Sequence, residues 1–236
     1  MCTVGSYDGV HIGHRRLIDE CRSRAHQIGG ESVLLTFEPH PRVVLGRAEG
    51  LKLLTTVDEK IELLAECGVD NLIVIPFDVP FSRLKYNDFV ERYLLDRVSM
   101  RSMVVGYNHL FGHKNEGDYN HLRLLSDQRG FDVVEMAELR NDERKVSSTV
   151  IRRLIESGAV EEANQHLGRP YLIIYGGVGG EPLKLFPPDG RYWAKVDGVE
   201  CVVEVVNQNS LVRLSGVEVE MGCRVEILKS IENVDM

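Results

Sequence analysis

Two histidines and three glycines lie close together near the start of the chain, within Val4–His14. Glycines let the backbone approach a ligand closely, and a helix N-terminus offers unpaired N–H groups and the positive end of a dipole. His11 and His14 are spaced three apart, so they can lie on one helix face and donate hydrogen bonds to phosphate oxygens. The spacing predicts a polyphosphate site. Solvent-facing histidines in a glycine turn and a metal-binding pair are the alternatives for this motif alone.

A second phosphate-binding pattern lies far along the chain, where Ser147-Ser148-Thr149 is followed by Arg152. Hydroxyl groups and the free N–H groups at a helix start can bind the same anion, and the planar fork of an arginine matches phosphate oxygens. Taken alone, Ser-Ser-Thr is more often only a helix N-cap. Together with the histidine motif, it makes phosphate binding a specific prediction.

The elements that must position these residues alternate, from residue 1 to about 168, between short apolar runs and helix-length amphipathic runs. This alternation predicts an α/β, Rossmann-like domain with a parallel sheet covered by helices. The predicted strands are Cys2–Gly5, Ser32–Thr36, Asn71–Pro76, Ser102–Gly106 and Asp132–Met136. The predicted helices are Leu17–Ile28, Thr55–Gly68, the regions near Asn87–Arg97 and Asp118–Arg129, Ser147–Ser157 and Val160–Leu167.

The sequence changes character after Gly168-Arg169-Pro170. Paired glycines interrupt it, and Val199–Val206 and Leu211–Val219 have the composition of strands. We therefore predict two domains, at residues 1–168 and 169–236, the second being small and mostly β. A domain of that size is near the lower limit for folding alone, so we expect it to pack against the larger one.

Composition restricts the class of protein. The formal net charge is -8, with 28 basic and 36 acidic residues and no basic cluster, which argues against a nucleic-acid partner. No apolar run approaches the roughly 20 residues that cross a bilayer, and the first residues do not form a secretory signal. The five scattered cysteines fit reduced thiols. We expect a cytoplasmic protein, and the sequence leaves its oligomeric state open.

The two phosphate-binding patterns together resemble the signature of the nucleotidyltransferase superfamily. Three further segments resemble the FMN adenylyltransferase (FAD synthetase) domain of the bacterial bifunctional riboflavin kinase/FAD synthetase family. These segments are Thr36–Pro41 (TFEPHP), Val104–Gly112 (VVGYNHLFG) and Leu167–Tyr171 (LGRPY). The resemblance covers about residues 3–171.

This resemblance implies an enzyme that transfers AMP from ATP to FMN, with Mg²⁺ accompanying ATP, and releases FAD and pyrophosphate without a covalent intermediate. The catalytic residues that it implies are His11, His14, Asn108, Ser147, Ser148, Thr149 and Arg152. The ATP contacts that it implies are Gly5, Ser6, Asp8, Gly9, His11, Gly13, His14, Ser148, Thr149 and Arg152. The FMN contacts that it implies are Phe37, Pro39, His40, Pro41, Tyr107, Asn108 and Phe111. A proline-stiffened turn is the alternative for the Phe37–Pro41 loop.

The chain also departs from the family in two places. His109 stands where the family usually has Phe. The tail is short and lacks both the G-x-P-T-A-N motif and the later catalytic Glu of the kinase domain, so we expect a remnant barrel without riboflavin kinase activity that covers or steadies the larger domain. The alternative functions are a related nucleotidyltransferase with another small phosphorylated acceptor, and a non-catalytic nucleotide- or flavin-binding protein.

Overall fold

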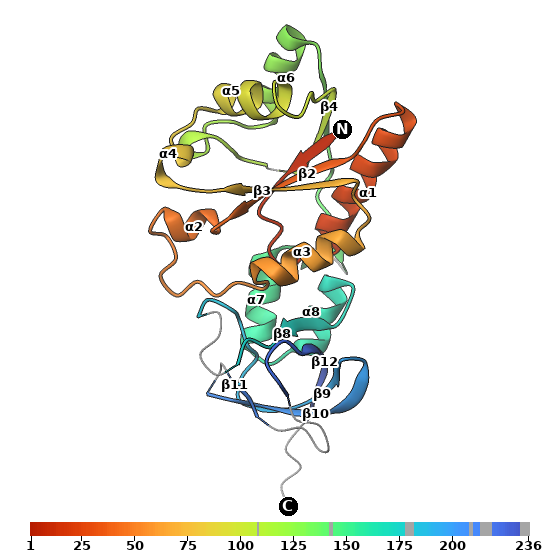
Figure 1. Cartoon of the computed structure of the whole chain (residues 1–236), viewed down its shortest axis with the longest axis vertical. Helices are drawn as coiled ribbons and strands as arrows, with labels where there is room; N and C mark the ends of the chain where they lie inside the picture. The colour runs from red at the N-terminus through yellow and green to blue at the C-terminus, as the bar shows by residue number, and fades with distance from the viewer. Residues whose placement is uncertain (108, 142–143, 178–181, 208–209, 213–218, 232–236) are drawn as a thin grey trace, which may run out of the picture. The chain divides into compact units, whose positions relative to one another are not determined.

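The computed structural model describes residues 1–107, 109–141, 144–177, 182–207, 210–212 and 219–231 (Figure 1). The chain forms two compact units. Unit 1 comprises Met1–Tyr7, Gly13–Glu49 and Leu64–Leu139, and unit 2 comprises Asp8–Ile12, Gly50–Leu63 and Arg140–Met236. The predicted phosphate loop is thus divided, with Asp8–Ile12 in unit 2 and the residues on both sides of it in unit 1.

Unit 1 is built on a five-stranded parallel sheet with the order β3-β2-β1-β4-β5. Its strands are β1 (Cys2–Val4), β2 (Val33–Glu38), β3 (Asn71–Pro76), β4 (Ser102–Val105) and β5 (Asp132–Glu135). The predicted Rossmann-like fold and its five strands are confirmed. The strand order reverses between β1 and β4, and open α/β sheets bind their ligands beyond the carboxyl ends of the strands at such a switch point. The segments after β1 and β4 are the ones predicted to bind ATP and FMN.

The helices around this sheet bury apolar residues at helical spacing, as in α1, whose Leu17, Ile18, Cys21 and Ala25 are buried. The predicted helix near Asn87–Arg97 is a short α-helix that continues as a π-helix. The helical elements that precede residue 130 are α1 (Ile12–Gln27), α2 (Pro41–Val44), α3 (Val57–Glu66), α4 (Val79–Ser82), α5 (Tyr86–Phe89), η1 (Val90–Leu95), η2 (His113–Asn115) and α6 (Tyr119–Arg129), and of these α3 belongs mostly to unit 2.

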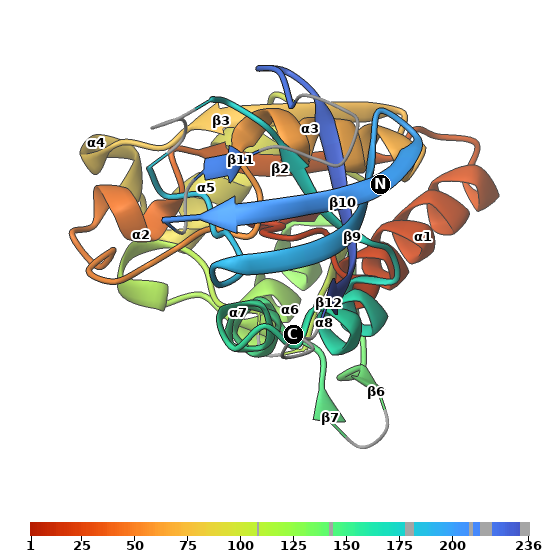
Figure 2. The ribbon, with the colours of Figure 1, turned by 90° about the horizontal axis from the view of Figure 1, so that it is seen from below.

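Unit 2 contains a five-stranded antiparallel sheet with the order β11-β10-β9-β12-β8. Figure 2 shows β9 and β10 side by side. The predicted strand Val199–Val206 is β10, whereas the 213–218 part of the predicted strand Leu211–Val219 lies outside the described residues. The elements are the hairpin β6 (Arg140–Asn141) and β7 (Arg144–Lys145), α7 (Ser148–Glu156), α8 (Val160–Leu167), β8 (Tyr171–Ile174), β9 (Gly190–Val196), β10 (Val199–Val206), β11 (Ser210–Val212) and β12 (Arg224–Ile231).

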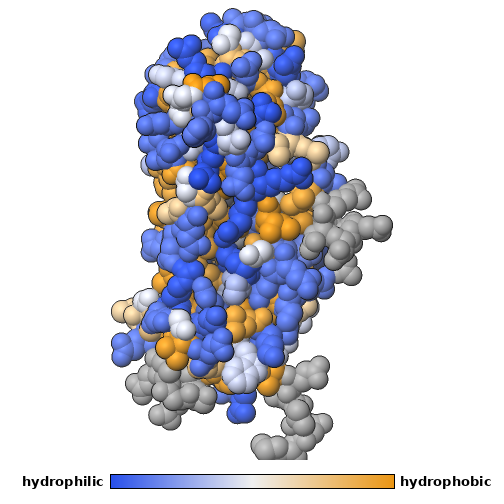
Figure 3. All heavy atoms as spheres, turned by 90° about the vertical axis from the view of Figure 1, so that its right-hand side faces the viewer, coloured by the Kyte–Doolittle hydropathy of each residue, from blue (hydrophilic) through white to orange (hydrophobic). Residues whose placement is uncertain are grey.

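Helices α7 and α8 share one apolar core with this antiparallel sheet. Ile151, Ile155 and Leu167 of the helices are fully buried together with Ile173 and Val203 of the strands. The predicted boundary between residues 168 and 169 therefore falls inside unit 2, and as a division between functional domains it stays a prediction. In the described part of the chain, no helix is long and apolar enough to span a membrane. Figure 3 shows hydrophilic and apolar residues interspersed over one face.

Candidate functional site

The turn that follows β1 has an unusual backbone. Tyr7 and Val10 have positive φ angles, 48° and 40°, which non-glycine residues rarely adopt. Each such residue costs about 1–3 kcal/mol, and strained residues of this kind cluster at ligand-binding sites. Gly9 has a φ of 84°, and a Cβ atom there would lie 2.7 Å from Cδ1 of Leu54, so only glycine fits. The glycine motif therefore forms a tight turn closely packed by its neighbours.

Within unit 1, Tyr7 anchors the start of this turn. Its side chain is 1% exposed, and its hydroxyl lies 2.9 Å from Oγ1 of Thr3. The His14 ring meets the Tyr7 ring edge-on, with centroids 5.2 Å apart and planes at 72°. A Cβ atom on Gly5 would approach the Tyr7 ring to 3.1 Å, so a small residue suits that position. These contacts hold the His14 ring in place.

His11 belongs to unit 2 and is 6% exposed. Burial lowers the pKa of His11 from 6.5 to about 4 because the imidazolium loses its hydration, a backbone hydrogen bond opposes the shift, and the nearby His166 lowers it further. The ring is therefore neutral at pH 7 and has one N–H to donate. A neutral imidazole can still polarise a phosphate oxygen as a hydrogen-bond donor.

Asp8 joins the two phosphate-binding patterns within unit 2. Its Oδ2 accepts a hydrogen bond from Nη2 of Arg152 at 3.0 Å, and its backbone carbonyl accepts one from Oγ of Ser148 at 2.9 Å. Its Oδ1 accepts hydrogen bonds from the backbone N and Oγ1 of Thr55, at 3.1 and 3.3 Å. The structure thus brings the glycine loop and the start of α7 together, as a shared phosphate site requires.

The start of α7 contains both structural and exposed polar groups. Ser147 is the N-cap, since its Oγ accepts a hydrogen bond from the backbone N of Val150 at 3.4 Å. Thr149 is exposed. Nε of Arg152 is buried, and no hydrogen-bond partner for it lies within the described residues. Arg152 therefore keeps donors beyond the one that Asp8 uses.

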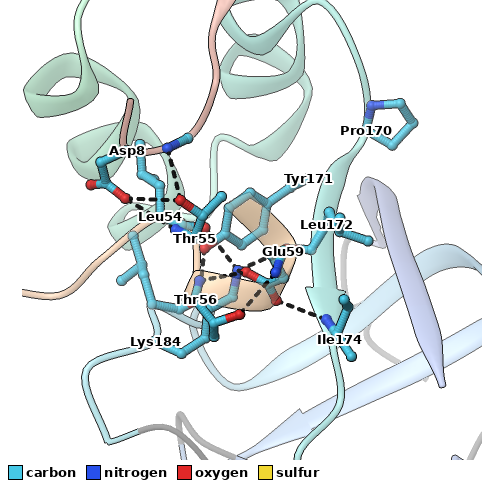
Figure 4. A network of polar contacts seen from close by, with 12 residues as sticks. Asp8, Leu54, Thr55, Thr56, Glu59, Pro170, Tyr171, Leu172, Ile174 and Lys184 are labelled. Atoms are coloured by element: carbon cyan, nitrogen blue, oxygen red, sulfur yellow. Dashed lines mark hydrogen bonds and ion pairs between the residues drawn. The ribbon is translucent and has the colours of Figure 1, made fainter. Parts of the chain in front are cut away.

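A buried network, which the sequence did not reveal, lies beneath this loop (Figure 4). Lys184 and Glu59 are 5% and 0% exposed, and Nζ of Lys184 donates to Oε2 of Glu59 at 2.6 Å. The same Nζ donates to the carbonyl oxygens of Leu54 and Leu172, at 2.7 and 2.8 Å, and lies 4.5 Å from the centre of the Tyr171 ring. Burial lowers the pKa of Lys184, while the Glu59 carboxylate opposes this shift. Three acceptors thus match the three protons of an ammonium group.

The end of α8 also contacts the glycine loop within unit 2. Gly168 adopts a left-handed conformation with a φ of 70°, and a Cβ atom there would lie 2.6 Å from Cγ2 of Ile12. Nη2 of Arg169 donates to the carbonyl oxygen of Gly9 at 2.8 Å. The segment Leu167–Tyr171, noted for its family resemblance, thus supports the predicted ATP loop.

Aromatic rings connect the predicted FMN segments within unit 1. The Phe37 ring lies 5.5 Å from that of Phe77 and 5.9 Å from that of Phe81. Phe81 lies 6.0 Å from Phe89, which lies 6.4 Å from Phe111, all measured between centroids. Rings at these separations attract one another and form a stiff apolar surface. Phe37 and Phe111, from two separate motifs, therefore belong to one aromatic cluster.

The Phe37–Pro41 loop has a structural task as well. Nδ1 of His40 accepts a hydrogen bond from the backbone N of Arg42 at 3.2 Å and so caps α2, whose first residue is Pro41. The peptide bond between Glu38 and Pro39 is cis. His40 is 8% exposed. A proline-stiffened turn and a ligand wall are compatible here, because the cap orders the segment that follows Phe37.

The segment after β4 is only partly described. Asn108 lies outside the described residues, and Tyr107 is 52% exposed. The His109 ring stacks on Phe111 with centroids 5.5 Å apart and planes at 21°, and burial lowers the pKa of His109 from 6.5 to about 4. Nε2 of His109 is buried, and no hydrogen-bond partner for it occurs in the part of the chain that the structure describes. His109 therefore packs as a neutral aromatic ring, much as a phenylalanine would.

The described site residues fall into two sets, and each set is defined within its own unit. The predicted residues in unit 2 are Asp8, Gly9, His11, Ser147, Ser148, Thr149 and Arg152. Those in unit 1 are Gly5, Ser6, Gly13, His14, Phe37, Pro39, His40, Pro41, Tyr107 and Phe111. Residues that sequence reasoning missed are Thr55, Glu59, Arg169 and Lys184. The contacts that link them to the glycine loop and to one another are remote in sequence, so no local pattern could have indicated them, and only the contact of Glu59 with Thr56 is local.

Comparison with known proteins identifies the family. The family model for FAD synthetase matches residues 1–150. The bifunctional riboflavin kinase/FMN adenylyltransferase of Listeria monocytogenes is 38% identical over 76% of this chain and 58% of that protein. Its namesakes from Bacillus subtilis and Escherichia coli are each 30% identical, over 82% and 77% of this chain and 66% and 58% of those proteins. The chain thus spans about three fifths of these curated relatives.

A solved structure shares the fold over the whole chain. The crystal structure described as a macrolide-efflux protein from Streptococcus pneumoniae aligns with a TM-score of 0.82 and 21% identity, covering 100% of this chain and 87% of that one. At this identity, the likeness concerns the fold alone. The family-model match over residues 1–150 and the identities to the curated relatives show that this chain belongs to the FAD synthetase family.

Proposed function

We propose that this chain is an FMN adenylyltransferase that transfers AMP from ATP to FMN and releases FAD and pyrophosphate. The observation that carries the proposal is the junction of its two phosphate-binding patterns, where Arg152 pairs with Asp8 at 3.0 Å and Ser148 bonds to the same residue. Such a junction gathers hydroxyl, guanidinium and helix N–H donors on one loop. Family membership supplies the choice of substrates.

In this reaction a phosphate oxygen of FMN attacks the α-phosphorus of ATP, and the bond to pyrophosphate breaks. The protein contributes positioning and neutralisation of charge, with no covalent step of its own. His11 and His14 donate hydrogen bonds to the phosphates, with His11 acting as a neutral donor. Ser148, Thr149 and Arg152 bind the triphosphate from the start of α7. Nε of Arg152 has no partner among the described residues, which is compatible with such a contact.

The flavin ring is proposed to bind against the aromatic cluster that contains Phe37 and Phe111. Flat, stiff ring surfaces suit an isoalloxazine. Tyr107, four residues before Phe111 in the sequence, adds an exposed aromatic ring. His109 does not argue against a flavin, because its neutral ring stacks on Phe111. Asn108 remains a sequence-based prediction.

Magnesium is proposed to enter with ATP. Within the described residues, no group of three His, Cys, Asp or Glu side chains could hold a metal ion. The Asp8 carboxylate is already occupied by Thr55 and Arg152. Mg²⁺ commonly binds through substrate phosphates and few protein ligands, so a metal carried by the triphosphate suits these residues better than a resident one.

Residues 169–236 are proposed to lack riboflavin kinase activity, since the G-x-P-T-A-N motif does not occur in them. Their contacts with the Asp8–Ile12 loop support a structural role instead. The cytoplasmic location stays a prediction.

The test incubates the full chain with Mg²⁺ and ATP, first with FMN and then with riboflavin, and separates the flavins by chromatography. FAD from FMN is the expected product, and riboflavin is expected to remain unchanged. Tight flavin binding without FAD would point to a binding protein, and pyrophosphate release only with another phosphorylated acceptor would point to a related nucleotidyltransferase. Production of ADP that depends on riboflavin would contradict the loss of kinase activity.

A further inference from the structure

We propose that Lys184 and Glu59 are positioning residues for adenylyl transfer, which act by fixing the Leu54–Thr56 peptide that holds Asp8 and Arg152. This inference rests on the proposed function, because it takes the Asp8–Ile12 loop and Arg152 as the ATP site. It gives the segment 169–236, which contains Lys184, a role in holding the ATP site in place. The residues that carry it all belong to unit 2.

Lys184 and Glu59 form an ion pair that is buried within unit 2. Removing two charges from water is costly, and a well-packed apolar pair often stabilises a core as well or better. Lys184 nevertheless has all three of its protons matched to acceptors, on Leu54, Glu59 and Leu172. A fully satisfied buried network specifies one geometry. The pair therefore fixes the position of the groups that it binds.

The buried pair binds backbone groups on both sides of Thr55. Lys184 binds the carbonyl oxygen of Leu54 at 2.7 Å, and Oε2 of Glu59 accepts from the backbone N of Thr56 at 2.9 Å. In return, Oγ1 of Thr56 accepts from the backbone N of Glu59 at 3.2 Å, which completes a capping box at the start of α3. The peptide on both sides of Thr55 is thereby held.

Thr55 connects this peptide to the predicted ATP contacts Asp8 and Gly9. Thr55 donates to Oδ1 of Asp8 through both its backbone N and its hydroxyl, and its Oγ1 accepts from the backbone N of Gly9 at 3.1 Å. The other carboxylate oxygen of Asp8 binds Arg152. Direct contacts thus run from Lys184 to Arg152 without a gap. A displacement of about 1 Å at such a site can cost about a hundredfold in rate.

The segment that carries Lys184 is itself tied to the same peptide. The backbone N of Leu53 donates to the carbonyl oxygen of Leu183 at 2.6 Å, and that of Leu185 donates to the carbonyl oxygen of Leu53 at 2.8 Å. Lys184 and Leu53 form a parallel bridge at this point. The Leu183–Leu185 segment therefore binds Leu53 through its backbone and Leu54 through the Lys184 side chain.

The test compares the wild-type full chain with the double variant Lys184→Met/Glu59→Gln, which removes both charges together. The matched control is Lys195→Met/Glu200→Gln, which removes an exposed pair 3.7 Å apart on the neighbouring strands β9 and β10 of unit 2. Circular dichroism and thermal unfolding report folding, calorimetry reports the Kd for ATP without FMN, and steady-state assays report kcat and the KM for FMN. The double variant should stay folded, lose about tenfold or more in kcat and ATP affinity, and keep its KM for FMN within about twofold. The control should match the wild type.

A double-mutant cycle with Arg152→Ala separates positioning from general stability. If the pair acts through Arg152, the two losses in kcat/KM will be clearly less than additive. Should the double variant fail to fold, Thr55→Val, which leaves the buried pair intact, must show the same kinetic pattern. Unchanged ATP affinity and kcat in the folded variants, or fully additive losses, would overturn the proposal.

Failure of the proposed function gives a different result. If the wild type binds ATP but makes no FAD, the adenylyltransferase assignment fails, and the ATP Kd of the variants alone decides whether the pair positions the loop. If the wild type binds no ATP, both proposals fail.

Discussion

Arg152 and Asp8 are 144 residues apart in the sequence, yet they form an ion pair of 3.0 Å in which their side chains are only 12% and 4% exposed. Exposed pairs of this kind contribute little to stability, whereas a largely buried charge that loses its partner is costly. The buried Asp8 carboxylate therefore fixes the orientation of the Arg152 guanidinium group.

Asp8→Asn should reduce kcat/KM for ATP by about tenfold or more. The amide keeps the shape of the side chain and an oxygen for Thr55, but it removes the negative charge that orients Arg152. Steady-state assays with varied ATP at saturating FMN measure the effect. The exposed Asp132→Asn serves as the control. An Asp8→Asn enzyme with unchanged kcat/KM would separate the ion pair from catalysis.

His14→Ala should lower kcat by about a hundredfold while the affinity for FMN changes little. The reason is that its N–H is proposed to act on charge that develops on the phosphates, and Tyr7 holds the ring in place for that task. Turnover assays and FMN titration by fluorescence measure the two quantities separately. His26→Ala, at an exposed position near the end of α1, should behave as the wild type. Equal losses in turnover and FMN affinity would count against the assigned role.

His109→Phe should stabilise the protein, and more so at acidic pH. The folded-state pKa of His109 is lowered to about 4, so between pH 6.5 and 4 the unfolded chain binds a proton that the folded chain does not. Wild-type stability therefore falls as the pH drops through this window, by up to about 3 kcal/mol for this one group. The variant removes this pH-dependent loss of stability and also removes the buried Nε2, for which the described residues provide no hydrogen-bond partner.

Urea unfolding of both proteins at pH 7.5 and pH 5 checks this prediction. The gap in the free energy of unfolding should be wider at pH 5. Part of the pH dependence should persist in the variant, because burial lowers the pKa of His11 in the same direction. The exposed His26→Phe should leave the pH dependence as it is. A gap that narrows at pH 5 would mean that His109 is protonated in the folded state.

Much of the fold follows from local pattern, and some of it does not. The alternation of apolar runs and amphipathic helices predicted β1 to β5 and their helices, because strands buried in a parallel sheet read as short apolar runs. Strands β9 and β12 were not predicted: β9 mixes Arg191, Trp193 and Lys195 with buried residues, and β12 mixes charged with apolar residues. The packing of α7 with the tail was also not predicted, since helical spacing does not indicate the partner of an apolar face.

Some residues of the candidate site could likewise be predicted from local sequence patterns, and others could not. His11, His14 and Arg152 could be found because phosphate-binding turns have a local signature. Lys184 could not, because its three acceptors lie 12 to 130 residues away and its own surroundings in the sequence resemble an ordinary loop. A single buried lysine has no motif, and its meaning comes only from the carbonyl and carboxylate groups that the fold places around it.

Phe37→Ala should raise the KM for FMN by about tenfold while the KM for ATP stays unchanged. Phe37 is half-buried and contacts Phe77 and Phe81, so its removal takes away one ring of the proposed flavin wall without emptying the core. Phe89→Leu is the matched control, because Phe89 belongs to the same cluster but is only 4% exposed. The control should lose about 1 kcal/mol of stability and keep both KM values. If both variants lose stability but keep both KM values, the aromatic cluster is only part of the hydrophobic core. If Phe37→Ala raises the KM for FMN alone, the cluster contributes directly to the acceptor site, since a purely structural ring would affect both substrates alike.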